Sequence, residues 1–138
     1  MYYEGGIREP FIARLPGTIK AGTTNDTPIH QVDLFPTLVA LSEGTPDASL
    51  DGLNILPALK GEALPERALF WHFPAYLQGY SKGNGSASQH FRTTPCGVIR
   101  KGDWKLIEYF EDGTIELYNL KDDLSEKNNL ASKKPEKA

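Results

Sequence analysis

The sequence predicts a fragment of an α/β protein whose C-terminal part is an α+β subdomain, with a four-stranded antiparallel sheet and short helices. Residues 96–120 contain three runs rich in β-branched and aromatic residues, which pack well on a pleated surface. Gly102 and Gly113 lie in the short turns between these runs, where antiparallel hairpins favour glycine. Ala68–Phe73 is a fourth such run, ends at Pro74 and is the natural neighbour of the other three. The three runs are Cys96–Arg100, Trp104–Phe110 and Thr114–Leu120.

The middle run has large apolar side chains in both phases of the strand alternation. Trp104 and Leu106 occupy one phase, whereas Ile107 and Tyr109 occupy the other. A sheet with one solvated face shows a clean alternation of apolar and polar residues instead. We therefore expect other parts of the chain to cover both faces of this sheet.

An isolated strand is expected near the N-terminus. Phe11–Leu15 is short and mostly apolar, follows Pro10 and ends at the turn residues Pro16 and Gly17. No later run resembles a parallel partner for it. We therefore expect an edge strand of a sheet whose other strands precede Met1.

A helix of about ten residues is predicted to begin at Asp33. Aspartate is a good N-cap, and Pro36 falls in the first turn, where its missing N–H leaves no hydrogen bond unmade. One apolar stripe at helical spacing follows and ends before Gly44. The stripe consists of Leu34, Phe35, Leu38, Val39 and Leu41.

Two shorter helical segments and one long loop are expected further along the chain. Asn54 precedes Ile55–Leu59, which is typical of a single helical turn and ends before Gly61. Residues 121–130 carry acidic side chains and then a lysine around two leucines, as a short closing helix would. Residues 79–92 are too polar and too rich in glycine for a core element, and long loops of this kind are often functional.

The composition is that of an ordinary soluble globular protein. Of the 138 residues, 39% are hydrophobic and 24% are charged, and the net charge of −3 gives no general attraction to nucleic acid. No apolar run approaches the roughly 20 residues of a membrane span, and the N-terminal residues lack both the basic and the apolar region of a signal peptide. The only cysteine, Cys96, excludes an internal disulfide and is typical of a small buried side chain at a strand start.

No complete catalytic constellation emerges from the residues alone. The histidines at positions 30, 72 and 90 have no spacing that would place two of them on one helix face as zinc ligands. The sequence has no Gly-x-Ser-x-Gly nucleophile elbow and no phosphate-binding glycine-rich loop before a helix. Composition and periodicity therefore support only a fragment of a soluble α/β protein.

Five blocks of sequence follow one another along the chain. They are Tyr3-Glu4-Gly5-Gly6-Ile7-Arg8-Glu9-Pro10 continuing to residue 17, Asp33-Leu34-Phe35-Pro36-Thr37-Leu38, Asp51-Gly52 with residues 56–62, Arg100-Lys101-Gly102-Asp103-Trp104-Lys105 continuing to residue 107, and Glu116-Leu117-Tyr118-Asn119-Leu120 followed by Asn128-Asn129-Leu130. Together they resemble the C-terminal third of the formylglycine-dependent sulfatases, arylsulfatase-like members of the alkaline phosphatase-like superfamily. The resemblance covers roughly residues 3–131 in the order that the family has them.

The resemblance implies an alkaline phosphatase-like fold and hydrolysis of sulfate esters. In this family a formylglycine hydrate, made from a Cys or Ser in a Cys-x-Pro-x-Arg motif, is the nucleophile, and a calcium ion held by Asp and Asn side chains neutralises charge. Cys96 follows Pro95 and precedes Gly97, so it does not match that motif. The resemblance places the nucleophile, the calcium ligands and a sulfate-binding lysine upstream. The chain is therefore expected to be inactive alone, with no catalytic residue and no metal ligand.

The resemblance also predicts domains and partners. Residues 1–45 resemble the end of the sulfatase catalytic domain, with an edge strand and a helix, and residues 46–138 resemble the C-terminal subdomain. The expected partners are the upstream catalytic domain and a sulfated small molecule or saccharide, without nucleic acid and without a membrane span. Family members are often periplasmic, secreted or lysosomal.

Three residues are expected to contact the substrate. His72 lies at a strand end among aromatic residues, and the corresponding Trp-His segment of many sulfatases approaches the substrate pocket. His90 and Arg92 lie on the long loop and are expected to meet a sugar or a sulfate group. The alternatives are a partly buried, structural His72 and a solvated loop.

The glycine-rich motif after Glu4 has a structural interpretation. We expect Gly5 and Gly6 to allow close approach of the backbone, and Arg8 to form an internal ion pair rather than to bind sulfate. Two other functions remain open for the whole chain. One is the C-terminal part of a related phosphodiesterase or phosphonate hydrolase, and the other is a stand-alone saccharide-binding or interaction module that uses residues 79–92.

Overall fold

The computed structural model describes residues 2–77, 91 and 93–138. The chain divides into two compact units, which we call the sheet unit (Met1–Pro10 with Glu66–Ala138) and the helical unit (Phe11–Pro65). This division differs from the boundary predicted after residue 45. The first residues contact the sheet, whereas residues 53–55 hydrogen-bond to residues 33–37. The assignment of residues 1–45 to a catalytic domain stays a prediction.

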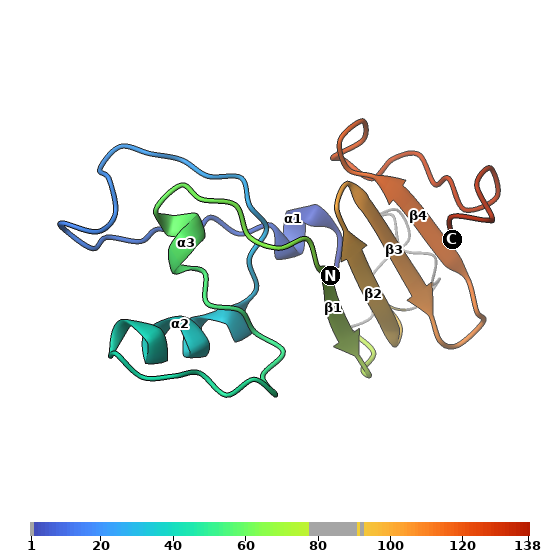
Figure 1. Ribbon diagram of the computed structural model, residues 1–138. Helices are drawn as coiled ribbons and strands as arrows, with labels where there is room; N and C mark the ends of the chain where they lie inside the picture. Colours follow the sequence, from blue (N-terminus) through green and yellow to red (C-terminus); the bar gives the residue numbers. More distant parts are fainter. Residues whose placement is uncertain (1, 78–90, 92) are drawn as a thin grey trace. The chain divides into compact units, whose positions relative to one another are not determined.

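The sheet unit contains the four-stranded antiparallel sheet that the sequence predicts (Figure 1). Its strands, in spatial order as in chain order, are β1 (Ala68–Phe73), β2 (Cys96–Lys101), β3 (Trp104–Tyr109) and β4 (Ile115–Asn119). Gly102 and Gly113, before and after β3, have φ angles of 56° and 69°, a left-handed conformation that glycine adopts without steric cost. The predicted hairpins and the pairing of the fourth run are therefore confirmed.

The register gives the sheet one well-covered face, which we call the inner face. Trp71, Val98 and Ile107 lie in one row across it. The N-terminal residues Tyr2 and Tyr3 pack against this face. Its buried core consists of Cys96, Val98, Ile107, Tyr109, Tyr118 and Leu120.

The opposite face, which we call the outer face, is covered unevenly. Phe70, Ile99, Leu106 and Leu117 form one row across the four strands. Leu117 in β4 is only 2% exposed, whereas Phe70 in β1 is 66% exposed. The expectation that both faces are covered therefore holds for the inner face and for the β4 side of the outer face.

Residues 121–130, expected to form a closing helix, form turns instead. The backbone N–H of Asn128 donates to Asp123 Oδ2 at 2.7 Å, and that of Leu130 donates to the carbonyl of Leu117 in β4 at 2.8 Å. Aspartate and asparagine side chains compete with a helix because they hydrogen-bond to nearby backbone groups. At the other end of the chain, the expected loop of residues 4–10 begins with one helical turn, α1 (Glu4–Ile7).

The helical unit contains the predicted helix, the predicted helical turn and one 3₁₀ turn. Its elements are a 3₁₀ turn η1 (Gln31–Asp33), α2 (Leu34–Leu41) and α3 (Leu56–Leu59). The Asp33 side chain does not cap α2 but accepts hydrogen bonds from the backbone N–H groups of His30 at 2.7 Å and Leu53 at 2.9 Å. Asn54 Oδ1 accepts from the N–H of Leu56 at 2.9 Å, as expected before α3. Asp33 therefore connects η1 to the segment that precedes α3.

Residues 11–15, predicted as an edge strand of a sheet that begins before Met1, form no strand in this chain, and their pairing with upstream strands stays a prediction. A strand exists through hydrogen bonds to a neighbouring strand, and the described part of the chain supplies no such neighbour for these residues. Phe11 is 48% exposed and Ile12 is 90% exposed. Their apolar side chains are therefore available for contact with other protein.

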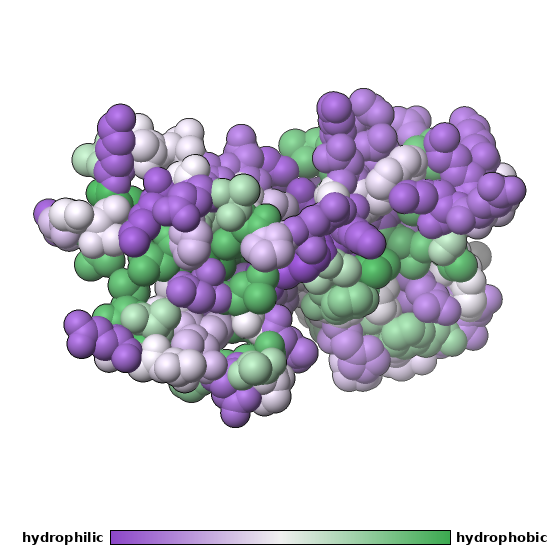
Figure 2. Space-filling model, viewed as in Figure 1, coloured by the Kyte–Doolittle hydropathy of each residue, from purple (hydrophilic) through white to green (hydrophobic). Residues whose placement is uncertain are grey.

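The apolar stripe of α2 is exposed as well. Its exposed fractions are 40% for Leu34, 62% for Phe35, 61% for Leu38 and 40% for Leu41. Figure 2 shows hydrophobic side chains at the surface of the molecule. Contiguous exposed apolar side chains commonly mark a contact surface.

Of the helices that the structure describes, none combines the length and the apolar character needed to cross a membrane.

Candidate functional site

His72, the first predicted substrate contact, lies on the outer face near the end of β1. Its side chain is exposed, and its ring centroid lies 5.6 Å from that of Phe110, with the ring planes at 35°. His72 pairs with Gly97 of β2, where an added Cβ would lie 3.1 Å from Phe110 Cζ. The glycine therefore leaves the space in which the Phe110 ring lies beside the imidazole. His72 is exposed in this chain, and its role as a substrate contact stays a prediction.

Other exposed aromatic side chains lie near His72, either in the chain or in the folded sheet. Phe70 is on the same face of β1, and Phe110 is itself 48% exposed. The Tyr76 hydroxyl donates to Glu111 Oε1 at 2.8 Å. An imidazole beside exposed aromatic rings combines hydrogen-bonding nitrogens with an apolar surface. This combination suits a ligand that has an apolar ring face and polar substituents.

His90 and Arg92, the other two predicted substrate contacts, lie outside the described residues, as does most of the loop that carries them. Their contribution to a site stays a prediction. The described part of the candidate site on the outer face therefore consists of His72 and its aromatic neighbours.

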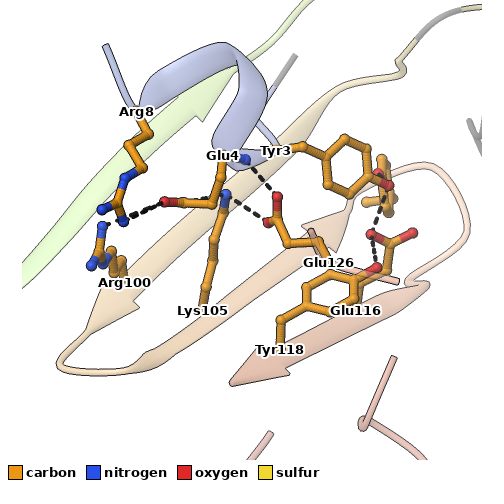
Figure 3. A network of polar contacts seen from close by, with 9 residues as sticks. Tyr3, Glu4, Arg8, Arg100, Lys105, Glu116, Tyr118 and Glu126 are labelled. Atoms are coloured by element: carbon orange, nitrogen blue, oxygen red, sulfur yellow. Dashed lines mark hydrogen bonds and ion pairs between the residues drawn. The ribbon is translucent and has the colours of Figure 1, made fainter. Parts of the chain in front are cut away.

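A buried ion cluster lies on the inner face (Figure 3), and the sequence analysis did not predict it. Lys105 of β3 has no exposed surface, and its Nζ lies 3.1 Å from Glu4 Oε1 and 2.8 Å from Glu126 Oε1. The backbone N–H of Glu4 also donates to Glu126 Oε2. Glu4 belongs to α1 and Glu126 lies beyond β4, so one lysine joins three segments of the chain.

Two arginines add positive charge beside Glu4. The Nη1 atom of Arg100 lies 3.6 Å from Glu4 Oε2, and that of Arg8 lies 3.9 Å from the same oxygen. The internal ion pair predicted for Arg8 is therefore confirmed. Burial raises the pKa of the Glu126 carboxyl, whereas its hydrogen bond from Lys105 acts in the opposite direction.

Within the described chain, no other segment approaches Gly5 closely. A Cβ added at this position would meet no other atom of the described chain within 4 Å. The contacts of this segment with the sheet come instead from Tyr3 and Glu4.

A hydrogen-bond network of tyrosines lies beside the ion cluster (Figure 3). The hydroxyls of Tyr3 and Tyr118 donate to Glu116 Oε2 at 2.8 Å and 3.0 Å, and the hydroxyl oxygens of Tyr3 and Tyr109 are 3.3 Å apart. Burial raises the pKa of Tyr109 to about 12 and raises that of Tyr3 above its usual range. Both phenols are therefore neutral at physiological pH. The N-terminal segment is held on the sheet by hydrogen bonds as well as by ion pairs.

One signal in the sequence pointed to Lys105. It shares the strand phase of Ile107 and Tyr109, and all three side chains are buried. Alternation therefore indicates a buried lysine, which requires a carboxylate partner. Spacing could not identify that partner, because Glu4 is 101 residues away in the chain.

A family model described as N-sulphoglucosamine sulphohydrolase, C-terminal, matches residues 1–138. The chain belongs to the sulfatase family. It is 35% identical to a sulfatase of Formosa agariphila, over 97% of this chain and 24% of that protein. It is also 39% identical to the N-acetylgalactosamine-6-sulfatase of Homo sapiens, over 66% of this chain and 17% of that protein.

Solved structures of sulfatases share the fold. The structure of BT4656 in complex with its substrate, D-glucosamine-2-N,6-O-disulfate, has a TM-score of 0.67 and 27% sequence identity, and covers 90% of this chain and 25% of that chain. A putative sulfatase from Bacteroides thetaiotaomicron has a TM-score of 0.52 and 28% identity, over 75% of this chain and 21% of that one. The chain spans about a quarter or less of the length of these sulfatases.

Membership of the sulfatase family implies a metal ion and a formylglycine in the full-length enzyme. Within residues 2–77, 91 and 93–138, no three His, Cys, Asp or Glu side chains come together in a group that could hold a metal ion. These residues therefore do not fit the metal site of the family. Cys96 is 1% exposed in the core of the inner face, and burial raises the pKa of its thiol. It is the small buried side chain that the sequence predicts.

Proposed function

We propose that this chain is the C-terminal part of a sulfatase that hydrolyses sulfate esters, and that the substrate is a sulfated saccharide. The match of the C-terminal family model to residues 1–138 carries the proposal. Two relatives support the substrate class. One is named N-acetylgalactosamine-6-sulfatase, and the other was solved with D-glucosamine-2-N,6-O-disulfate.

In this proposal, the outer face near His72 forms part of the wall of the substrate pocket. An exposed imidazole N–H donates a hydrogen bond to a sulfate or hydroxyl oxygen of the substrate. The ring of Phe110, beside it, offers an apolar surface to the sugar ring. His90 and Arg92 add donors from the loop of residues 79–92.

The reacting groups belong to another part of the enzyme in this proposal. A calcium ion and a formylglycine made from an upstream Cys or Ser supply the charge neutralisation and the nucleophile. The described residues do not fit a metal ion, and Cys96 is buried in the sheet core. The contribution of this chain is therefore substrate binding and packing, and no turnover is expected from the chain alone.

Residues 1–45 form the end of the catalytic domain of the full-length enzyme in this proposal, and they pack against its upstream part. The apolar side chains of Phe35 and Leu38 on α2 are more than half exposed, at 62% and 61%, and Ile12 is 90% exposed. A catalytic domain that covers these side chains would remove an apolar surface from water.

The test uses the complete enzyme that carries this chain. Its turnover is measured with an aryl sulfate, with a 6-O-sulfated glucosamine and with a phosphodiester. We expect hydrolysis of the sulfate esters. Hydrolysis of the phosphodiester alone would contradict the proposal and support a related phosphodiesterase. If the complete protein hydrolyses no sulfate ester and the isolated chain binds a saccharide, the results would support a binding module instead.

A further inference from the structure

The N-terminal segment, residues 2–8, docks on the inner face of the sheet although the helical unit separates it from β1 in sequence. The ring centroid of Tyr2 lies 5.6 Å from that of Phe73, and that of Tyr3 lies 6.5 Å from that of Tyr118. Glu4 then enters the ion cluster. The sheet therefore contacts three successive side chains of this segment.

Apolar packing alone does not fix the register of this docking. Tyr2 and Tyr3 are the same residue type, and both pack against the core of the inner face. Burial of apolar surface has no preferred direction. A one-residue shift that moves Tyr2 to the site of Tyr3 would still place a tyrosine ring there.

The ion cluster does discriminate between registers. Glu4 is the only acidic residue among residues 1–8, so a one-residue shift would bring Tyr3 or Gly5, and no carboxylate, to Lys105. In a shifted register Lys105, which has no exposed surface, would keep only Glu126 as a partner. The Glu4 carboxylate, 5% exposed in the docked register, would lose its lysine, which is strongly unfavourable for a buried charge. The backbone N–H of Glu4 also donates to Glu126. The Glu4 carboxylate reaches Lys105 and the Glu4 N–H reaches Glu126 at the same time only in this register.

We propose that Lys105 is a positioning residue that fixes the register in which residues 2–8 dock on the sheet. A buried ion pair adds little net stability compared with an apolar replacement of similar volume, but it penalises every pairing that leaves a charge alone. The register also determines where the rest of a sulfatase joins the sheet, a consequence that rests on the proposed function.

The amide NMR signals of Gly5 and Gly6 report the register, because these residues directly follow Glu4. The unmodified chain is expected to show one signal for each glycine. A triple variant, Glu4→Gln with Lys105→Met and Glu126→Gln, removes the buried charges together and is expected to keep the signals of the sheet strands. We expect at least two signals for each glycine in this variant, because several registers become similar in energy.

Two further variants complete the test. Lys101→Met removes an exposed lysine of β2 and is expected to keep one signal for each glycine. Glu4→Gln alone leaves Lys105 paired with Glu126 and is expected to split the signals, so the test does not depend on the folding of the triple variant. A single signal for each glycine in Glu4→Gln, whatever its position, would overturn the proposal. The spectra do not depend on turnover. A complete enzyme that is inactive on sulfate esters would therefore contradict the proposed function without affecting the test of the register.

Discussion

Glu4 and Lys105 are 101 residues apart in the chain, yet Glu4 Oε1 lies 3.1 Å from Lys105 Nζ in the interior of the sheet unit. The lysine is fully buried and the glutamate is 5% exposed. Each of these charges is stable in the interior only because the other is present, together with Glu126. The N-terminal segment and β3 are therefore energetically coupled.

Lys105→Met, made alone, is expected to destabilise the chain. The substitution leaves two buried carboxylates, Glu4 and Glu126, without their lysine, and breaking a buried pair in this way typically costs about 3–5 kcal/mol. The exposed Lys101→Met is the matched control, with an expected change within about 0.5 kcal/mol. Urea unfolding of both variants measures the difference. Equal stability of the two variants would show that the ion pairs of Lys105 contribute no net stability to the folded chain.

Alkaline pH is expected to destabilise the sheet unit through its buried tyrosines. Burial raises the pKa of Tyr109 from an ordinary value of 10.0 to about 12, so the unfolded chain loses this proton first. The contribution is fully present below pH 10 and is lost as the pH rises through about 12. Two pKa units correspond to about 2–3 kcal/mol.

Tyr109→Phe isolates this effect from other groups that titrate in the same range. Its unfolding free energy, measured by urea titration at several pH values, is expected to fall less between pH 10 and pH 12 than that of the unmodified chain. Parallel curves for the two proteins would mean that Tyr109 ionises equally easily in the folded and unfolded states.

Leu117→Ala is expected to be costly although it lies on the unevenly covered outer face. Leu117 is 2% exposed, and truncation of a buried leucine typically costs about 2–5 kcal/mol through lost burial and the cavity that remains. Phe70→Ala, in the same row but 66% exposed, is the control and is expected to change the stability much less. A larger loss for Phe70→Ala would show that the outer face is covered near β1 in solution.

The sheet could be predicted because its signals are local. Alternation, β-branched residues and the glycines at positions 102 and 113 lie within each hairpin, and the structure has the four strands within one or two residues of the predicted runs. The helix at Leu34–Leu41 follows from its apolar spacing in the same way. Its cap was predicted less well, because the Asp33 carboxylate is bound by the distant backbone N–H of Leu53.

The ion cluster could not be predicted, because it depends on contacts between distant segments. No spacing rule connects Glu4 with Lys105 and Glu126, and residues 4–10 have the composition of a loop. Residues 11–15 form no strand in this chain for a related reason. An apolar run indicates that a strand is favourable, whereas a strand forms only where a partner supplies hydrogen bonds.

His72→Ala, in the complete enzyme, separates a substrate contact from a structural residue. The side chain is exposed, so its removal is expected to change the stability by no more than about 0.5 kcal/mol. A hydrogen bond to a charged sulfate oxygen contributes about 1.5–3 kcal/mol, which predicts a kcat/KM lower by roughly 10- to 100-fold.

The division of that loss between KM and kcat identifies the role of His72. A contact made equally in the bound substrate and in the transition state raises KM, whereas a contact that strengthens in the transition state, such as proton donation to the leaving oxygen, lowers kcat. Lys101→Met, with an exposed side chain on the neighbouring strand, controls for general effects of surface substitution. A destabilised His72→Ala enzyme with unchanged kcat/KM would show that His72 does not contact the substrate. The imidazole would then only stabilise the fold, through its contact with the Phe110 ring beside Gly97 of β2.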